Sequence, residues 1–255
     1  MSELHGFRKG SNLAFEDERA DLAAAFRWTA RLNMHEGVAN HFSLAVSDDG
    51  QKFLMNPNGR HFSRVKASDL LLLDAADPKT MERPDAPDAT AWFLHGALHR
   101  HVPQARCVMH VHSKYATVLA SLADSTMPPI DQNTMRFYGK IAIDDGYDGM
   151  GLGDEAERVG ALMRANADKT VLIMGNHGIM VFGQTVADTF DEMYYFERSC
   201  ETLITAYMTG KPLRVASHEV AEKTARQWRE YPNIGELHFA ELKAILDGEG
   251  SDYRR

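Results

Sequence analysis

Two histidines alternate within an apolar run, Val108-Met109-His110-Val111-His112, and a third follows another apolar run at Asn176-His177-Gly178. Side chains at positions i and i+2 of a β-strand point to the same face of a sheet. His110 and His112 can therefore bind one ion together, and His177 would complete the site. A lone histidine at the end of a buried strand is usually only hydrogen-bonded there, but three imidazoles with open coordination positions are typical of a catalytic zinc centre.

The pattern of apolar residues predicts a mixture of helices and short strands. Helical spacing covers residues 15–35, 90–101, 113–122, 154–165, 185–208 and 217–247. Strands are predicted at 42–46, 52–55, 69–74, 106–112, 170–174 and 178–182, with a loop at 75–88 and irregular chain at 124–140. The helices and strands do not alternate regularly. We therefore expect an α/β protein whose sheet contains antiparallel pairs and is covered by helices.

The length of 255 residues fits one α/β domain better than two. We expect a domain over residues 15–210 and a helical C-terminal extension of the same domain over 211–255. The extension would cover its own sheet or a neighbouring subunit.

The net charge of the chain bears on its binding partners, and its cysteine content bears on its cellular compartment. The formal charge of −8 argues against nucleic acid and anionic membranes as partners. No apolar run is long enough to predict a membrane-spanning helix. The two cysteines, Cys107 and Cys200, lie in apolar stretches and are predicted to be buried free thiols, which favours a cytoplasmic protein.

The helix predicted at 90–101 contains His95, His99 and His101. The spacing of His95 and His99 would place both on one helix face, but the glutamate of a zinc-protease helix is missing between them. We therefore do not predict a second metal site. His99 and His101 are expected to favour the helix dipole at its C-terminal end.

The run from His95 to His112, together with Gly175–Gly183, resembles the class II aldolase/adducin family over roughly residues 15–210. The resemblance implies a three-layer α/β/α fold around a mostly antiparallel sheet. It also implies a homotetramer with sites at subunit boundaries. The metal ligands that it implies are His110, His112 and His177, with Zn²⁺ as the expected metal and Mn²⁺ as the alternative.

The chemistry implied by the resemblance is Lewis-acid catalysis. A divalent ion stabilises the enolate that forms when a carbon–carbon bond breaks or a carboxylate leaves. Three neutral imidazoles leave a net charge of +2 on such a centre, which suits a small anionic substrate.

One position departs from the pattern of the aldolases that the chain resembles. Those enzymes carry a glutamate that serves as metal ligand and acid/base, four residues before the position of His95, and here that position is Ala91. Asp88, one turn earlier, is a candidate substitute for the acid/base, although an aspartate at a helix start usually caps the helix. Otherwise the chemistry needs no carboxylate, or catalysis has been lost.

The loops that bind the substrate anion in those aldolases are also only partly kept. The matching positions read Ala39-Asn40, Asn58-Gly59 and Ala89-Thr90. Asn40, Asn58 and Thr90 still offer hydrogen-bond donors, and we predict that they bind substrate together with Gly59. Asn58-Gly59 is also an ordinary turn sequence.

Three functions remain open from the sequence. The favoured one is a divalent-metal-dependent lyase that performs aldol cleavage or decarboxylation of a small oxygenated anion. The second is a non-catalytic, adducin-like binding or scaffold protein, which Ala91 supports. The third is a sugar-phosphate epimerase, since it would use the same metal centre.

Overall fold

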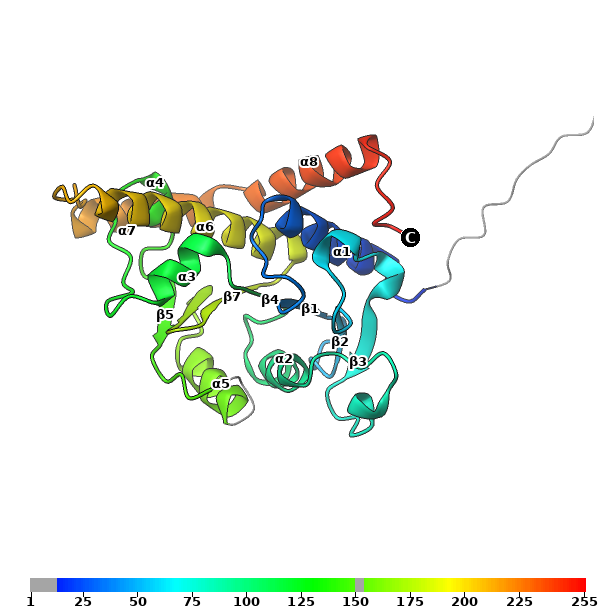
Figure 1. The fold of residues 1–255 in the computed structure, drawn as a ribbon. Helices are drawn as coiled ribbons and strands as arrows, with labels where there is room; N and C mark the ends of the chain where they lie inside the picture. The colour runs from blue at the N-terminus through cyan, green and yellow to red at the C-terminus, as the bar shows by residue number, and fades with distance from the viewer. Residues whose placement is uncertain (1–12, 150–153) are drawn as a thin grey trace, which may run out of the picture.

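The computed structural model describes residues 13–149 and 154–255, which form one central sheet with helices on both faces (Figure 1). The strands are β1 His41–Ala45, β2 Lys52–Met55, β3 Leu71–Asp74, β4 Cys107–Val111, β5 Ile141–Asp144, β6 Val171–Met174 and β7 Gly178–Gly183. The helices are α1 Glu16–Arg31, α2 Ala89–His101, α3 Lys114–Ala120, α4 Gln132–Arg136, α5 Glu155–Ala165, α6 Val186–Met208, α7 His218–Glu230 and α8 Ile234–Gly248. The expected three-layer α/β/α architecture is confirmed.

The seven strands run in the order β3-β2-β1-β4-β7-β6-β5. Every neighbouring pair is antiparallel except β5 and β6, which are parallel. The prediction of a mostly antiparallel sheet is therefore correct. Strand β4 lies at the centre between β1 and β7, so the two strands that flank it bring distant parts of the chain beside His110.

Alternation along β4 separates two layers of side chains. Cys107, Met109 and Val111 point into the main core, which includes α1 and α6. Val108 points the other way, into a smaller core that includes residues of α2 and α5. His110 has the same parity as Val108, so period-2 alternation directs it toward the α2 and α5 layer.

The C-terminal helices pack on the main core. Phe239 and Leu242 of α8 belong to the same apolar cluster as α1 and α6, and Nε1 of Trp28 donates to the Leu242 carbonyl at 2.9 Å. The division of the chain at residue 210 remains a prediction. No helix in the described ranges is both long and apolar enough to span a membrane.

Local differences from the sequence prediction follow from short-range hydrogen bonds. Residues 124–140, expected to be irregular, contain α4, which a reciprocal capping box between Asp131 and Thr134 initiates. Asp69 lies in a 3₁₀ turn, so β3 begins two residues later than predicted. Cys107 and Cys200 are buried free thiols, as predicted.

Candidate metal centre

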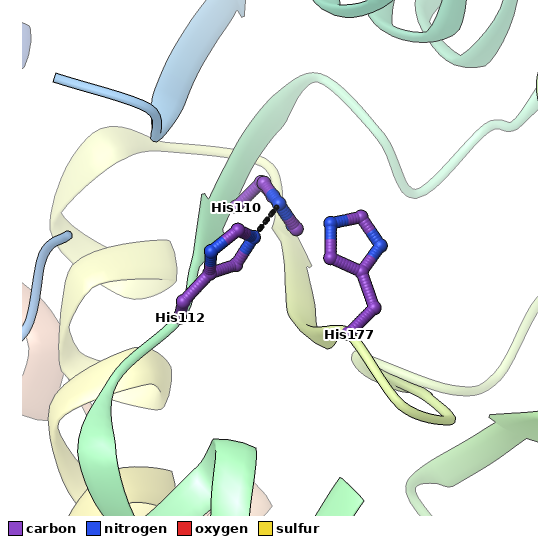
Figure 2. Close-up of side chains that lie close together, drawn as sticks. All are labelled: His110, His112 and His177. Atoms are coloured by element: carbon purple, nitrogen blue, oxygen red, sulfur yellow. Dashed lines mark hydrogen bonds between the residues drawn. The ribbon is translucent and has the colours of Figure 1, made fainter. Parts of the chain in front are cut away.

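Three imidazoles meet at the end of β4 (Figure 2). His110 lies on β4 and His112 directly after it, whereas His177 belongs to the corner between β6 and β7. The ring centroids of the three histidines are 4.8 Å apart in each pair. One nitrogen from each ring lies within 4.8 Å of the other two, which makes the triad a potential metal centre.

The corner Asn176-His177-Gly178 positions the third imidazole. Asn176 adopts a positive φ of 56°, a conformation that asparagine tolerates better than most residues, and its amide donates to the Ala120 carbonyl at 2.9 Å. A Cβ on Gly178 would lie 2.7 Å from the Val111 carbonyl oxygen and 2.8 Å from Cδ2 of His112. Glycine is therefore required where the corner passes beside the ring of His112.

The Nδ1 atoms of the three histidines face away from the centre. Nδ1 of His110 is 2.9 Å from the Ile179 carbonyl oxygen, and Nδ1 of His112 is 2.6 Å from Oε2 of Glu36. Nδ1 of His177 is 3.9 Å from Oε1 of Glu155, too far for a hydrogen bond. The outward partners of His110 and His112 orient these two rings and leave each Nε2 for the centre, as second-sphere groups do around bound metals.

The protonation state of the triad also suits a cation. Burial lowers the pKa of His177 to about 4 and places the pKa of His110 well below its ordinary value. Nε2 of His110 lies 2.9 Å from Nε2 of His112, and both rings use Nδ1 for their outward hydrogen bonds. A metal-binding imidazole must be neutral, and two neutral rings in this arrangement would aim their lone pairs at one another. A divalent cation would relieve this repulsion, so the residues present fit a metal.

A cavity of about 470 Å³ opens beside the triad. Its walls include the predicted site residues Asn40, Asn58, Asp88, Thr90 and Ala91, together with the three histidines. Gly59 is not among the residues that line it. Gly59 instead supplies a positive φ of 72° in the turn that follows Asn58. The structure therefore brings the predicted substrate-binding side chains and the predicted metal ligands to one cavity.

Asn40 has a free donor in the cavity wall. Its Oδ1 accepts from the Glu36 amide at 2.7 Å, and its Nδ2 is buried without a hydrogen-bond partner among the described residues. A buried donor without a partner is costly, so this amide is suited to an oxygen atom of a ligand.

Asp88 caps helix α2. Its Oδ1 accepts from the amide and hydroxyl of Thr90 and from the amide of Ala91. Burial alone raises the pKa of this carboxyl, but the hydrogen bonds from Thr90 and Ala91 and the nearby His41 outweigh it and lower the pKa. Asp88 is therefore held as an anion at the helix start, and its role as acid/base stays a prediction.

Three titratable residues of the cavity wall escaped the sequence prediction: His41, Tyr147 and Glu155. Glu155 is buried and opens helix α5, and burial is the main cause that raises the pKa of its carboxyl. The sequence showed Glu155 only as a residue near a helix start. Its position across from His177 depends on how α5 packs on the sheet.

The histidines of α2 are buried more deeply than predicted. His99 does not serve the helix dipole at the surface: its Nδ1 is 2.6 Å from the Ala105 carbonyl oxygen and its Nε2 is 2.7 Å from Oγ of Ser43. His95 is fully buried and His101 is exposed. Within the described part of the chain, the triad is the single group of three or more His, Cys, Asp or Glu side chains close enough together to hold a metal ion.

A family model described as Class II Aldolase and Adducin N-terminal domain matches residues 20–204. The chain belongs to this family. A relative in Pseudomonas aeruginosa that carries a class 2 aldolase name is 30% identical over 243 residues, which cover 93% of this chain and 92% of the relative. The Decarboxylase NovR of Streptomyces niveus is 26% identical over 227 residues, 86% of this chain and 82% of that protein.

Solved structures of the family share the fold. The crystal structure of an aldolase II superfamily protein from Pseudomonas syringae superposes with a TM-score of 0.83 at 28% identity, covering 97% of this chain and 98% of that one. The architecture described above is therefore the family architecture, and the triad and its cavity are features of a class II aldolase-like domain.

Proposed function

We propose that this family member is a divalent-metal-dependent lyase that acts on a small oxygenated anion, and that it decarboxylates its substrate rather than performing aldol cleavage. The observation that carries the proposal is a cavity with three converging imidazole nitrogens and a methyl group, Ala91, at the position of the aldolase glutamate. A divalent ion held by His110, His112 and His177 would supply a Lewis acid that stabilises negative charge on a substrate oxygen.

The absence of the glutamate distinguishes the two reactions. Aldol cleavage begins when a base removes a proton from a substrate hydroxyl, and the methyl of Ala91 cannot do so. Decarboxylation of a 3-oxo acid needs no base at the start, because the carboxylate departs as carbon dioxide and the electron pair of the broken carbon–carbon bond stays on the substrate as an enolate. It needs only a proton donor for the resulting carbanion. The similarity to a protein named as a decarboxylase supports the same choice.

The wall of the cavity offers groups for binding and for proton transfer. Nδ2 of Asn40 is free to donate to a substrate oxygen, and Asn58 and Thr90 lie in the same wall. Two carboxyl groups line the cavity, those of Asp88 and Glu155. Burial raises the pKa of Glu155, whereas hydrogen bonds hold Asp88 as an anion. Glu155 is therefore the better proton donor to the carbanion.

The test compares carbon dioxide release from a panel of 3-oxo carboxylates with aldehyde release from a panel of hydroxylated sugar phosphates. Protein loaded with Zn²⁺ or Mn²⁺ is expected to release carbon dioxide, and protein stripped of metal is not. Sugar-phosphate cleavage or epimerisation without carbon dioxide release would contradict the proposal. No turnover with either panel, and a protein partner retained after His110→Ala and His112→Ala, would instead favour the adducin-like function.

Two variants separate the roles of the carboxyl groups. Glu155→Gln is expected to lower kcat roughly 100-fold or more, the usual contribution of a proton-transferring group. Asp88→Asn should keep turnover, because asparagine caps a helix as well as aspartate does. The opposite result would assign the proton to Asp88.

The proposal includes Zn²⁺ as the preferred metal, a cytoplasmic location and a homotetrameric assembly. Exposed apolar side chains in the C-terminal part of the chain support assembly. Met208 at the end of α6, Tyr231 just after α7 and Leu237 of α8 are 81%, 61% and 63% exposed in the single chain. Light scattering of the purified protein tests the assembly: a monomer at micromolar concentration would contradict it.

A further inference from the structure

A continuous line of hydrogen bonds runs beneath the cavity between buried side chains. Nδ1 of His41 is 2.7 Å from Nε2 of His95, and Nδ1 of His95 is 2.5 Å from Oγ of Ser43. The same hydroxyl is 2.7 Å from Nε2 of His99, whose Nδ1 is 2.6 Å from the Ala105 carbonyl oxygen. We call His41, His95, Ser43 and His99 the histidine relay.

Local geometry explains why these four residues meet. His41 and Ser43 are two residues apart on β1, so they point to the same face of the sheet. His95 and His99 are four residues apart on α2, so they lie on one face of that helix. His41 also pairs with His110 across β1 and β4, and the two rings stack with centroids 4.7 Å apart. The relay therefore ends beside a predicted metal ligand.

The carbonyl of Ala105 sets the direction of the whole relay. A carbonyl oxygen only accepts, so Nδ1 of His99 must carry a proton. Burial lowers the pKa of His99 to about 4 and that of His95 well below its ordinary value, so these two rings are neutral. Nε2 of His99 is then a lone pair, and the Ser43 hydroxyl must donate to it.

The remaining protons follow in sequence. Because the Ser43 proton is used, its oxygen accepts from Nδ1 of His95. Nε2 of His95 is then unprotonated and accepts from Nδ1 of His41. A neutral His41 with its proton on Nδ1 has a lone pair on Nε2. His41 lines the cavity, and its Nε2 has no hydrogen-bond partner among the described residues.

We infer that the relay holds His41 as a hydrogen-bond acceptor toward the cavity, and that the substrate carries a hydroxyl group beside its metal-binding oxygen to donate to Nε2. The second half of this inference rests on the proposed function, which places the substrate oxygen at the triad. The stacking of His41 on His110 puts the acceptor next to that oxygen.

This arrangement discriminates between substrates. A hydroxyl forms a hydrogen bond with the fixed lone pair. An ether, ketone or carboxylate oxygen at the same place meets another lone pair and is disfavoured, and His41 cannot turn its proton toward it without breaking the relay. The favoured class is therefore a small hydroxy acid or hydroxy ketone whose two neighbouring oxygens face the metal and His41.

The first experiment measures the tautomer of His41 in the metal-free protein, so that it depends on neither metal nor activity. Long-range ¹H–¹⁵N spectra of ¹⁵N-histidine-labelled protein, with His41 assigned by the loss of its signals in His41→Phe, report which nitrogen carries the proton. The expected result is protonation at Nδ1 and a bare Nε2. A proton on Nε2 of His41 in the wild-type protein would overturn the inference.

The variant Ser43→Ala breaks the relay at its centre, and the exposed histidine variant His101→Phe is its matched control. Ser43→Ala is expected to give a mixture of His41 tautomers, whereas His101→Phe should keep the wild-type pattern. An unchanged His41 tautomer in a folded Ser43→Ala protein would show that the relay does not set it. The wild-type measurement remains decisive if this variant fails to fold.

The second experiment tests the substrate class by binding alone. Titration calorimetry of Zn²⁺-loaded protein compares glycolate, which has a hydroxyl to donate, with methoxyacetate, which has the same charge and no donor. Wild-type protein is expected to prefer glycolate by about five- to tenfold, the effect of one hydrogen bond. His41→Phe should lose most of that preference, and His101→Phe should keep it.

The outcomes separate this inference from the proposed function. A glycolate preference that depends on His41 supports the inference even if no carbon dioxide is released from any 3-oxo acid. Equal binding of the two probes by wild-type protein, or no binding of glycolate, would overturn the hydroxyl assignment even if the lyase activity is found.

Discussion

One face of the sheet carries two clusters of histidines, the triad of His110, His112 and His177 and the histidine relay, and their hydrogen bonding differs. In the relay, each unprotonated nitrogen from His95 and His99 meets a proton from the next group along. In the triad, the Nδ1 atoms of His110 and His112 bond outward and their Nε2 atoms lie 2.9 Å apart. The hydrogen bonds of the relay are satisfied within the relay, whereas the triad offers nitrogens that the proposed divalent cation would bind.

The difference shows that burial does not by itself decide what a histidine does. His95 and His110 are both almost fully buried, and burial lowers the pKa of both. Their roles differ because donors and acceptors alternate around His95 and do not alternate around His110. An unprotonated imidazole nitrogen with no hydrogen-bond donor beside it is free to bind a metal ion. One that accepts a hydrogen bond instead helps to hold the surrounding side chains in place.

The largest expected effect comes from breaking the triad. His110→Ala should lower Zn²⁺ affinity about 100- to 1000-fold, since a zinc site of about 10–16 kcal/mol shares its binding energy among a few ligands. Competition with a chromophoric chelator measures the affinity. The relay variant His99→Phe is the control, because His99 is as buried but does not face the metal. Equal losses of Zn²⁺ affinity in both variants would mean that the triad does not contribute more to metal binding than the histidine relay does.

Acid should destabilise the protein through the relay. An unfolded histidine takes up a proton near pH 6.5, whereas burial holds the pKa of His41 and His99 at about 4 in the folded protein. The free energy of unfolding is therefore highest above pH 6.5. As the pH drops from 6.5 toward 4, each such histidine lowers it by about 3 kcal/mol.

Urea unfolding of the metal-free protein between pH 7.5 and pH 4 measures this dependence. His99→Phe removes one titrating group and should give a flatter profile than wild type, whereas the exposed variant His101→Phe should not. A free energy of unfolding that stays constant from pH 7.5 to pH 4 would contradict the neutral, buried state of the relay.

The smallest expected effect concerns the outward partner of His112. Oε2 of Glu36 is 2.6 Å from Nδ1 of His112, and the Glu36 side chain is 66% exposed. Glu36→Ala should weaken Zn²⁺ binding about tenfold, at the low end for second-sphere groups because water can replace the carboxylate. Glu82→Ala, a change at another exposed glutamate, is the control. A loss as large as that of His110→Ala would make Glu36 itself a ligand.

The sequence predicted that the three histidines lie together, because the signal for this is local. Two histidines at i and i+2 in a strand share a face whatever surrounds them, and Asn176 and Gly178 are suited to the backbone that the corner adopts. Most of the order of strands and helices could be predicted for the same reason. The prediction missed the short helix α4, whose capping box gives no hydrophobic period, and the edge strand β5. It also treated residues 217–247 as one helical stretch, which the structure divides into α7 and α8.

The sequence did not predict that His41 and Glu155 lie beside the triad. His41 lies 69 residues from His110 along the chain and Glu155 lies 45 residues beyond it, and neither distance carries a periodic signal. The pairing of β1 with β4 places His41 beside His110, and the packing of α5 places Glu155 across from His177. The packing of α2 against β1 places His99 in the relay, whereas the sequence predicted only a role at the helix end.

The amino-acid sequence by itself determined the residue types, the strand that carries His110 and His112, and the methyl group at Ala91. Only the tertiary structure decided which nitrogen of each ring faces the cavity. A tautomer depends on the hydrogen-bond partner of the opposite nitrogen, and for His110 and His41 that partner comes from another strand or helix. The local sequence pattern thus limits the interactions that a side chain can form, and long-range packing decides which of these interactions it forms.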